Sequence, residues 1–321
     1  MTPNKKKVLL PNTMAKAGWD VLADRDDIEA VPYEPYISMP DFQVALRDTD
    51  GVALSLTPLK APEIAVAPRL RVAARIGVGY DAVEIPALTA RGIPLMVVGT
   101  ANSVSVAEHA IFMMYALAKK VMFHDAAVRD NRWQDRWKDV PFDLAGKTLL
   151  IVGFGHIGAR LAALAKAFGM RVIALKRDPS TSIGTADAVL PQDRLLEQLP
   201  TADYVALTCP LTRETERMIN AQALAAMKPS AFLINVARGR VVDEPALIAA
   251  LAEKRIAGAG IDCTVEEPLP ADSPLWGFDN ALITPHTAGE TRRYEDNVID
   301  LLLENLDRLW RGETVLKNQV V

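Results

Sequence analysis

The feature that most constrains the fold is residues 148–158, TLLIVGFGHIG, in the middle of the chain. The apolar run at 149–152 predicts a strand buried on both faces. It ends at the G-x-G-x-x-G turn of residues 153–158, and apolar residues then recur at helical spacing up to Phe168. A strand, a glycine-rich turn and a helix in this order are typical of a dinucleotide-binding site.

Each glycine of this turn has an expected role. Gly153 allows the tight turn, Gly155 lets the backbone approach the phosphates, and Gly158 lets the helix pack against the strand. The amides and dipole at the helix start attract the pyrophosphate. A glycine-rich turn with no ligand is the alternative, and the flanking strand and helix favour the binding interpretation. His156 is expected to contribute its backbone more than its ring.

Composition indicates an ordinary globular protein. The 321 residues suit two domains, and the net charge of −4 gives no reason to expect nucleic-acid or membrane binding. No apolar run approaches the ~20 residues of a membrane span, so a cytoplasmic location is expected. The two cysteines, Cys209 and Cys263, each lie in an apolar run and are interpreted as reduced core residues, with no metal-type cluster in the sequence.

The first hundred residues alternate strand and helix patterns, which predicts a doubly wound parallel sheet. We expect strands near 8–10, 28–31, 52–56, 71–76 and 95–98, and helices near 15–23, 40–47, 63–67 and 83–91. The turn at residues 76–81, IGVGYD, has two open interpretations. It is either a tight turn with Asp81 as a helix N-cap or a nest of amides that binds a carboxylate.

A long apolar helix follows, starting at Ser103 or Ser105, with Glu108 placed as in a capping box after Ser105, and running to Met122. Residues 129–137, RDNRWQDRW, come next. Their charges nearly cancel, which favours a subunit contact over a nucleic-acid site. We therefore predict a homodimer that buries Trp133 and Trp137.

The alternation restarts at residue 147 and predicts a complete nucleotide-binding domain. Expected strands lie at 149–152, 171–175, 204–207, 232–236, 259–262 and 282–284, with helices at 157–168, 194–199, 221–227 and 245–253. The amphipathic helix at 291–311 is expected to return to the first domain. The predicted fold class is α/β, with two doubly wound parallel-sheet domains. A Rossmann-type domain, 102–289, is inserted in a flavodoxin-like substrate domain, 1–101 and 290–321.

Three polar residues follow strand ends in the second domain, at the edge where ligands bind in such sheets. They are Arg238, Glu267 and His286. Singly they read as a surface cation, a solvated loop acid and a packed histidine. Together they offer a carboxylate binder, a carboxylate and an acid/base imidazole, because a neighbouring carboxylate stabilises a protonated imidazole.

Over essentially its whole length, the chain resembles the D-isomer-specific 2-hydroxyacid dehydrogenase family, of the glyoxylate/hydroxypyruvate reductase type. The matching motifs are GVGYD at 77–81, VAEH at 106–109, GFGHIG at 153–158, CPLTRET at 209–215, NVARG at 235–239, Asp262 with Glu267-Pro268, and PHTAG at 285–289. Thr264 departs from the aromatic or bulkier residue usual there.

The resemblance implies roles for individual residues. Arg238 would grip the substrate carboxylate and carbonyl, His286 would be the acid/base, and Glu267 would tune it. The amides of Val78 and Gly79 would hold the substrate carboxylate. The resemblance also implies a dimer built around the nucleotide-domain helices. Implied cofactor contacts come from Val106, Gly153, Gly155, His156, Ile157, Gly158, Lys176, Arg177, Cys209, Pro210, Thr215, Val236, Ala237, Asp262, His286 and Ala288.

The residues after the second strand of this domain predict a preference for NADP(H), with NAD(H) also possible. NAD enzymes of this fold place an acidic residue there to hold the ribose 2′-hydroxyl. Here Lys176 stands 18 residues beyond Gly158, and Arg177 follows it. Two cations there would attract a 2′-phosphate. The alternatives are that Asp178 does the carboxylate's work, or that all three are ordinary solvated charges.

The implied activity is hydride transfer between a nicotinamide and a 2-keto or D-2-hydroxy acid, a small-molecule substrate. Two rivals share the fold, formate oxidation and 3-phosphoglycerate oxidation. In the family, formate chemistry uses a glutamine where Glu267 stands, and the phosphoglycerate enzymes often carry a regulatory domain that we do not expect here. A third rival is a cofactor-sensing binding protein of the corepressor type.

Overall fold

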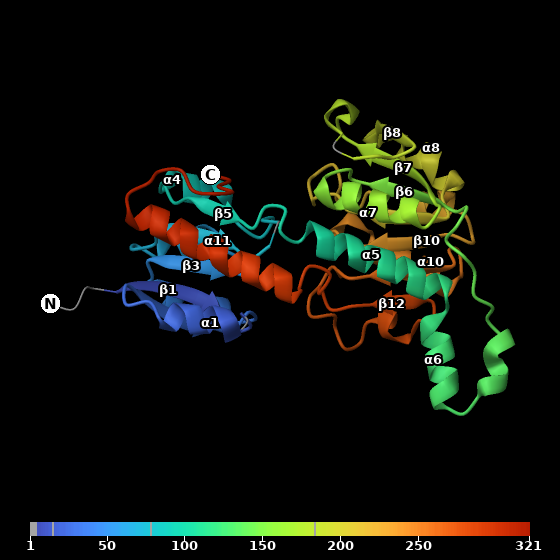
Figure 1. The fold of residues 1–321 in the computed structure, drawn as a ribbon, viewed down its shortest axis with the longest axis horizontal. Helices are drawn as coiled ribbons and strands as arrows, with labels where there is room; N and C mark the ends of the chain where they lie inside the picture. The colour runs from blue at the N-terminus through green and yellow to red at the C-terminus, as the bar shows by residue number, and fades with distance from the viewer. Residues whose placement is uncertain (1–4, 15, 78, 183) are drawn as a thin grey trace. The chain divides into compact units, whose positions relative to one another are not determined.

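The computed structural model describes residues 5–14, 16–77, 79–182 and 184–321 (Figure 1). They form two compact units. Unit 1 comprises Met1–Asn102 with Glu290–Val321, and unit 2 comprises Ser103–Gly289. Each unit has a parallel sheet with helices on both faces, so the predicted α/β class with two doubly wound domains is confirmed.

The sheet of unit 1 has, in the described residues, the strand order β2-β1-β3-β4-β5. All its pairings are parallel, and this order is that of flavodoxin-like domains. The strands are β1 (Lys6–Pro11), β2 (Ile28–Tyr33), β3 (Gly51–Leu54), β4 (Val72–Arg75) and β5 (Leu95–Val97).

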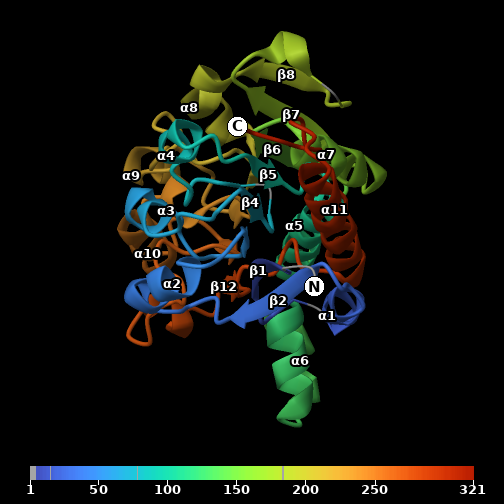
Figure 2. The ribbon, with the colours of Figure 1, turned by 90° about the vertical axis from the view of Figure 1, so that its left-hand side faces the viewer.

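Alternation along these strands gives unit 1 two apolar faces. Leu9 and Leu54 pack with helices α2 (Met39–Leu46), α3 (Ala61–Ala65) and α4 (Ile85–Ala90). Val8 and Leu10 point the other way, toward α1 (Lys16–Ala23) and α11 (Arg292–Trp310). Figures 1 and 2 both show α11, in red, lying against this sheet. The last helix therefore packs on the N-terminal strands, as expected.

The sheet of unit 2 has the order β12-β11-β10-β9-β6-β7-β8. The order reverses between β6 and β9, which is the topological switch point of a Rossmann-type fold. The strands are β6 (Thr148–Val152), β7 (Arg171–Lys176), β8 (Ala188–Pro191), β9 (Tyr204–Leu207), β10 (Phe232–Asn235), β11 (Gly258–Ile261) and β12 (Ala281–Ile283).

Helices cover both faces of this sheet because its central strands are apolar on both sides. Leu149 and Ile151 face α5 (Ser103–Ala118) and α7 (His156–Ala167). Leu150 and Val152 face the opposite layer. That layer contains α8 (Leu195–Gln198), α9 (Ala221–Ala226) and α10 (Glu244–Ala252). The continuous apolar run that predicted a strand buried on both faces is explained by this arrangement.

Three sequence expectations about local structure are wrong. The apolar helix does not run to Met122, because Lys120 adopts a left-handed conformation with φ 52° and starts a separate helix, α6 (Val121–Arg129). Ser105 lies inside α5, so it forms no capping box with Glu108. Asp81 is not a helix N-cap, since α4 begins after Glu84.

Strand β8 was not expected from the sequence. It is a short edge strand that ends in Pro191, and its residues are only half-buried or exposed, so it lacks the apolar run that marks the central strands. Its pairing with β7 extends the sheet beyond the second strand of the nucleotide-binding half.

Beyond α6 lies the 3₁₀ helix η1 (Trp133–Trp137), and Figures 1 and 2 show α6 extending away from the body of unit 2. In the described part of the chain, no helix combines the length and the apolar character needed to cross a membrane.

Candidate active site

The glycine-rich turn joins β6 to α7 at the switch point of the unit 2 sheet. Gly153 has φ +99°, and a side chain there would meet the backbone nitrogen of Cys209 at 2.5 Å. A side chain on Gly158 would collide with the carbonyl oxygen of Gly153. The Thr208 hydroxyl donates a 2.6 Å hydrogen bond to that same oxygen and fixes the turn. Both glycines are thus required by close packing of the turn.

Gly155 differs from the other two glycines because nothing lies within 4 Å of the place a side chain would occupy. It is the N-cap residue of α7 and has no side chain with which to satisfy the first amides of the helix. Open space beside a helix N-terminus is what a dinucleotide pyrophosphate needs. The turn therefore fits a dinucleotide pyrophosphate, which the backbone at Gly155, His156, Ile157 and Gly158 would hold.

The cations expected at the end of β7 lie where the sequence placed them. Lys176 is the last residue of β7, and its ammonium donates to the carbonyl oxygen of Thr181. Arg177 is exposed. Asp178 caps the 3₁₀ turn η2 (Pro179–Thr181), accepting from the Ser180 amide at 3.0 Å and its hydroxyl at 2.6 Å. These two bonds hold the pKa of Asp178 below its usual value.

Asp262 follows β11 and anchors the loop that carries the candidate acid/base. Its carboxylate accepts hydrogen bonds from the Thr284 hydroxyl at 2.6 Å and from the amides of Thr287 at 2.9 Å and Ala288 at 3.0 Å. Its carbonyl oxygen accepts the His286 amide at 2.8 Å. Asp262 is buried, at 2% exposed, so these partners also satisfy its charge.

His109 on α5 joins the same network, which sequence reasoning missed. Its Nε2 lies 3.0 Å from the Thr284 hydroxyl, and that hydroxyl donates its single hydrogen to Asp262. The Thr284 oxygen must then accept, which assigns the proton of His109 to Nε2. Burial lowers the pKa of His109, against a smaller opposing effect of Asp262. His109 therefore acts as a neutral donor that orients Thr284.

His286 and Glu267 form the central pair of the site. His286 Nδ1 lies 2.8 Å from Glu267 Oε2, and the other carboxylate oxygen accepts the Thr264 amide at 3.2 Å. Both side chains are about a quarter exposed, so the pair is reachable. His286 has φ +56°, a conformation that costs a non-glycine residue of the order of 1 kcal/mol. The Asp262 network holds it there, with Nε2 left for a ligand.

Arg238 comes from the loop after the neighbouring strand, β10. The buried Asn235 side chain clamps this loop, accepting from the Ala237 amide at 3.1 Å and donating to the Arg238 carbonyl at 3.0 Å. A side chain on Gly239 would collide with the backbone of Thr264, so the loops after β10 and β11 are in direct contact. Close packing of two loops at one sheet edge brings Arg238 into the same region as Glu267.

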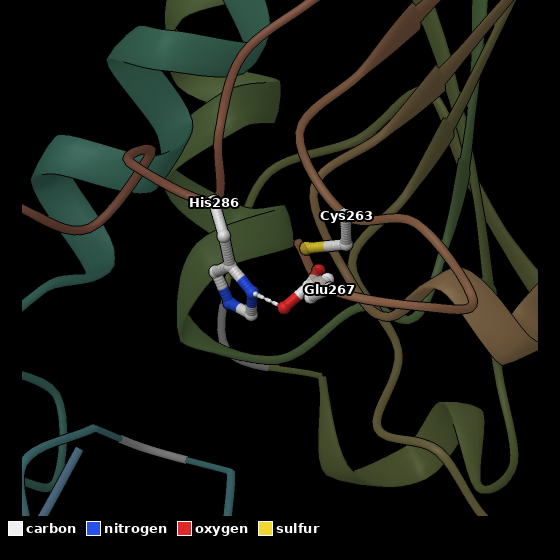
Figure 3. A group of neighbouring side chains, drawn as sticks. All are labelled: Cys263, Glu267 and His286. Atoms are coloured by element: carbon white, nitrogen blue, oxygen red, sulfur yellow. Dashed lines mark hydrogen bonds and ion pairs between the residues drawn. The ribbon is translucent and has the colours of Figure 1, made fainter. Parts of the chain in front are cut away.

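The structure also brings Cys263 close to this pair, although the sequence indicated only a reduced core cysteine. The potential ligand atoms of Cys263, Glu267 and His286 all lie within 4.8 Å of one another (Figure 3). Cys263 is buried, as predicted, and its thiol donates to the Ala237 carbonyl at 3.6 Å. The sequence separations did not suggest a cluster, because it forms only where the loops that follow the paired strands β11 and β12 meet.

The remaining expected cofactor contacts are placed on the same unit. Burial raises the pKa of the Cys209 thiol to about 11, so this cysteine stays protonated. The Thr215 hydroxyl donates to the Pro210 carbonyl at 2.7 Å and accepts the Thr212 amide at 2.7 Å, which shapes the loop after β9. Four further contacts expected from the sequence are buried side chains: Val106, Val236, Ala237 and Ala288.

The candidate substrate turn lies in unit 1. Gly77 has φ +151°, and its Cα faces the guanidinium of the buried Arg75, which would lie 3.2 Å from an added side chain. Arg75 donates to the carbonyl oxygens of Leu54 at 3.0 Å and Ile76 at 2.7 Å. Gly79 is half-buried. The expected carboxylate contact at Val78 lies outside the described residues.

Fold and site together define a nicotinamide-dinucleotide-binding protein with an imidazole–carboxylate pair. Residues 111–288 match the family model for the NAD binding domain of D-isomer specific 2-hydroxyacid dehydrogenases. Among curated proteins, a glyoxylate reductase of Korarchaeum cryptofilum is 37% identical over 276 residues, covering 84% of this chain and 82% of the relative. A D-3-phosphoglycerate dehydrogenase of Synechocystis is 34% identical over 91% of this chain and 52% of its own length.

A solved structure extends the likeness to the whole fold. The NADPH-dependent glyoxylate/hydroxypyruvate reductase of Sinorhizobium meliloti, in complex with NADP and malonate, has a TM-score of 0.84 and 29% identity, covering 99% of this chain and 97% of its own. This chain belongs to the D-isomer-specific 2-hydroxyacid dehydrogenase family. It is an oxidoreductase that acts on 2-hydroxy acids.

The open space at Gly155 generates a first prediction. Gly155→Ala should leave the thermal unfolding temperature unchanged and weaken nicotinamide dinucleotide binding about tenfold or more, which is about 1.4 kcal/mol. Gly277→Ala is the matched control, since Gly277 also has nothing within 4 Å and no positive φ. Calorimetric titration of both variants measures the effect. Equal affinity in Gly155→Ala and wild type would show that the pyrophosphate lies elsewhere.

Proposed function

We propose that this enzyme reduces small 2-keto acids of the glyoxylate and hydroxypyruvate class to D-2-hydroxy acids with NADPH. The observation that carries the proposal is the 2.8 Å contact between His286 and Glu267. The pair follows strands of the same sheet that carries the dinucleotide turn. In this proposal unit 2 binds the cofactor. A cytoplasmic location stays a prediction.

The chemistry of the pair follows from the two nitrogens of the imidazole. A bound nicotinamide supplies the hydride that reduces the carbonyl carbon. The Nδ1–H of His286 donates a hydrogen bond to the Glu267 carboxylate and keeps its proton. Nε2 is therefore the atom that gives a proton to the developing alkoxide. The Glu267 charge stabilises the imidazolium that must be present before transfer. In the reverse direction neutral Nε2 accepts the hydroxyl proton.

Arg238 is proposed to bind the substrate carboxylate and to stabilise the alkoxide. Its side chain is half-buried, and its guanidinium donates a hydrogen bond to the Ala237 carbonyl at 2.7 Å. A guanidinium has five N–H donors in a fixed plane, a geometry that matches a planar carboxylate. In a partly desolvated site, such a contact strengthens as negative charge develops on the substrate oxygen.

The substrate class is supported by the relatives rather than by pocket dimensions. The K. cryptofilum relative is a glyoxylate reductase, and the S. meliloti structure is of a glyoxylate/hydroxypyruvate reductase. The D-3-phosphoglycerate dehydrogenase relative supports a second candidate, in which a larger phosphorylated substrate is oxidised. Turnover of purified protein on glyoxylate, hydroxypyruvate and 3-phosphoglycerate separates these. Turnover would also exclude a purely cofactor-sensing role.

The catalytic assignment predicts that two substitutions act differently. His286→Asn removes the proton donor, so kcat should fall by roughly 10²–10⁴-fold while dinucleotide binding persists. Arg238→Ala removes substrate binding as well as alkoxide stabilisation, so kcat/KM should fall with a raised KM. Steady-state kinetics of glyoxylate reduction measure both. Near-normal kcat in His286→Asn would refute the acid/base role.

NADPH preference is supported by the contacts of the three charged residues at the end of β7, Lys176, Arg177 and Asp178. The Asp178 carboxylate already accepts hydrogen bonds from the Ser180 amide and hydroxyl. It is therefore poorly placed to hold a ribose hydroxyl. Lys176 reaches back to the Thr181 carbonyl, and Arg177 is exposed beside it. Two positive charges therefore lie at the strand end where the ribose 2′ position is read in this fold.

This arrangement predicts that wild type has a higher kcat/KM with NADPH than with NADH. Lys176→Asp combined with Arg177→Ser should reverse or abolish the preference, because it removes two cations and restores a carboxylate at the strand end. Arg194→Ser is a suitable control, since Arg194 is an exposed cation of unit 2 that pairs with Glu197. A wild-type preference for NADH, or an unchanged preference in the double variant, would contradict the proposal.

A homodimer is supported by apolar side chains that unit 2 leaves exposed on α5 and on the segment after it. On α5 the Phe112 side chain is 50% exposed and Tyr115 is 43% exposed. On η1, Trp133 is 68% exposed and Trp137 is 71% exposed. Exposed aromatic residues at such density are typical of protein interfaces. We propose that a second copy of the chain covers them.

Sedimentation at micromolar concentration tests the dimer. Wild type should sediment as a dimer, and Trp133→Ala with Trp137→Ala should shift it toward monomer by removing two large apolar contacts. Trp276→Ala is the matched control, since Trp276 is 61% exposed in the same unit but lies in the loop after β11. A monomeric wild type would remove the basis for an intersubunit role of these tryptophans.

A further inference from the structure

The thiol beside the acid/base pair has no part in the proposed reaction. Cys263 is 2% exposed, directly after the Asp262 anchor, and its sulfur lies within 4.8 Å of the Glu267 and His286 ligand atoms. Figure 3 shows the Cys263 side chain extending toward the pair. Sulfur, imidazole nitrogen and carboxylate oxygen are the three ligand types that Zn²⁺ accepts in proteins.

We propose that Cys263, Glu267 and His286 form an inhibitory binding site for Zn²⁺ and similar thiophilic divalent ions. Three protein ligands and one open position are the pattern of accessible zinc sites. The open position would be on the side of His286 and Glu267, whose side chains are 25% and 24% exposed, because Cys263 is buried. Mg²⁺ and Ca²⁺ are not expected there, because they prefer sites made of oxygen ligands.

The geometry requires side-chain adjustments of about an ångström or less, because sulfur lies about 3.6 Å from the other ligands of a tetrahedral zinc site and the three ligand atoms here lie within 4.8 Å of one another. In a tetrahedral zinc site the nitrogen and oxygen ligands are about 3.3 Å apart, given metal–ligand distances of about 2.0–2.1 Å. His286 Nδ1 and Glu267 Oε2 are 2.8 Å apart, so the pair must open by about half an ångström. The backbone stays fixed, because the Asp262 network holds the loop of His286 and the Thr264 amide holds Glu267.

Metal binding has a defined proton balance. The Cys263 thiol releases its proton to solvent and binds as thiolate. His286 gives up the hydrogen on Nδ1, so a neutral ring carries its proton on Nε2 instead. The metal thus replaces the hydrogen bond between His286 Nδ1 and Glu267. It also holds a proton on Nε2, the nitrogen that must exchange a proton with the substrate. Inhibition of turnover rests on the proposed acid/base role of His286, whereas binding itself does not.

Binding is tested with Cd²⁺, whose thiolate complexes absorb in the ultraviolet, and inhibition with Zn²⁺. Wild type should take up one Cd²⁺ per chain with a thiolate band, and Zn²⁺ should inhibit glyoxylate reduction until a chelator removes it. Cys263→Ser should lose the band and bind Cd²⁺ at least tenfold more weakly. Its inhibition by Zn²⁺ is measured relative to the rate of the same variant without metal. Cys209→Ser should keep the band, because Cys209 lies outside the cluster.

A second variant, Glu267→Gln, guards against misfolding of the serine variant. It keeps the thiol and should still bind Cd²⁺ more weakly than wild type, since a neutral amide is a poorer ligand than a carboxylate. Absence of a thiolate band in wild type, or unchanged affinity in Cys263→Ser, would overturn the proposed metal site. A site lost in Cys263→Ser whose occupation leaves the wild-type rate unchanged would establish the metal site and refute the acid/base role of His286.

Discussion

The rest of the site depends on the hydrogen bonds that the buried carboxylate of Asp262 accepts. It gathers the Thr284 hydroxyl and the amides of Thr287 and Ala288, and its carbonyl oxygen receives the amide of His286. These bonds hold His286 at φ +56°, which an isolated chain would rarely adopt. The imidazole can then present Nδ1 to Glu267 and keep Nε2 for a substrate.

A second layer of contacts holds this anchor in place. The Thr284 hydroxyl that bonds to Asp262 is itself oriented by neutral His109, from a helix on one face of the sheet. On the other side, Asn235 clamps the loop of Arg238, and Gly239 permits that loop to touch the backbone of Thr264. Preorganisation of this kind keeps charged groups in place before the substrate arrives.

The sequence predicted the parts of the fold that depend on local pattern. The buried strand, glycine turn and helix of residues 148–168 appear as β6 and α7, because each apolar position has a sheet or helix face to fill. Two elements without a clear local pattern were missed or misplaced. Edge strand β8 lacks an apolar run, and the left-handed break at Lys120 follows an apolar stretch that reads as continuous helix.

The candidate site was predictable in the same uneven way. Arg238, Glu267 and His286 were selected as candidates because each follows a strand end in a parallel sheet. The roles of His109 and Thr284 depend on contacts between residues 175 positions apart, and periodicity carries no information about such contacts. The approach of Cys263 to the acid/base pair was missed for the same reason, since its apolar flanks indicated only a core residue.

The central claim is that the Glu267 charge supports a proton-donating His286 during keto-acid reduction. The most direct measurement is kcat for glyoxylate reduction, at one pH, in wild type and in Glu267→Gln, with dinucleotide affinity measured alongside. Glutamine can still accept the Nδ1 hydrogen bond but carries no charge, so it stabilises the imidazolium less. The account predicts that the variant binds the dinucleotide as wild type does and has a kcat lower by about tenfold or more. An unchanged kcat in the variant would contradict it.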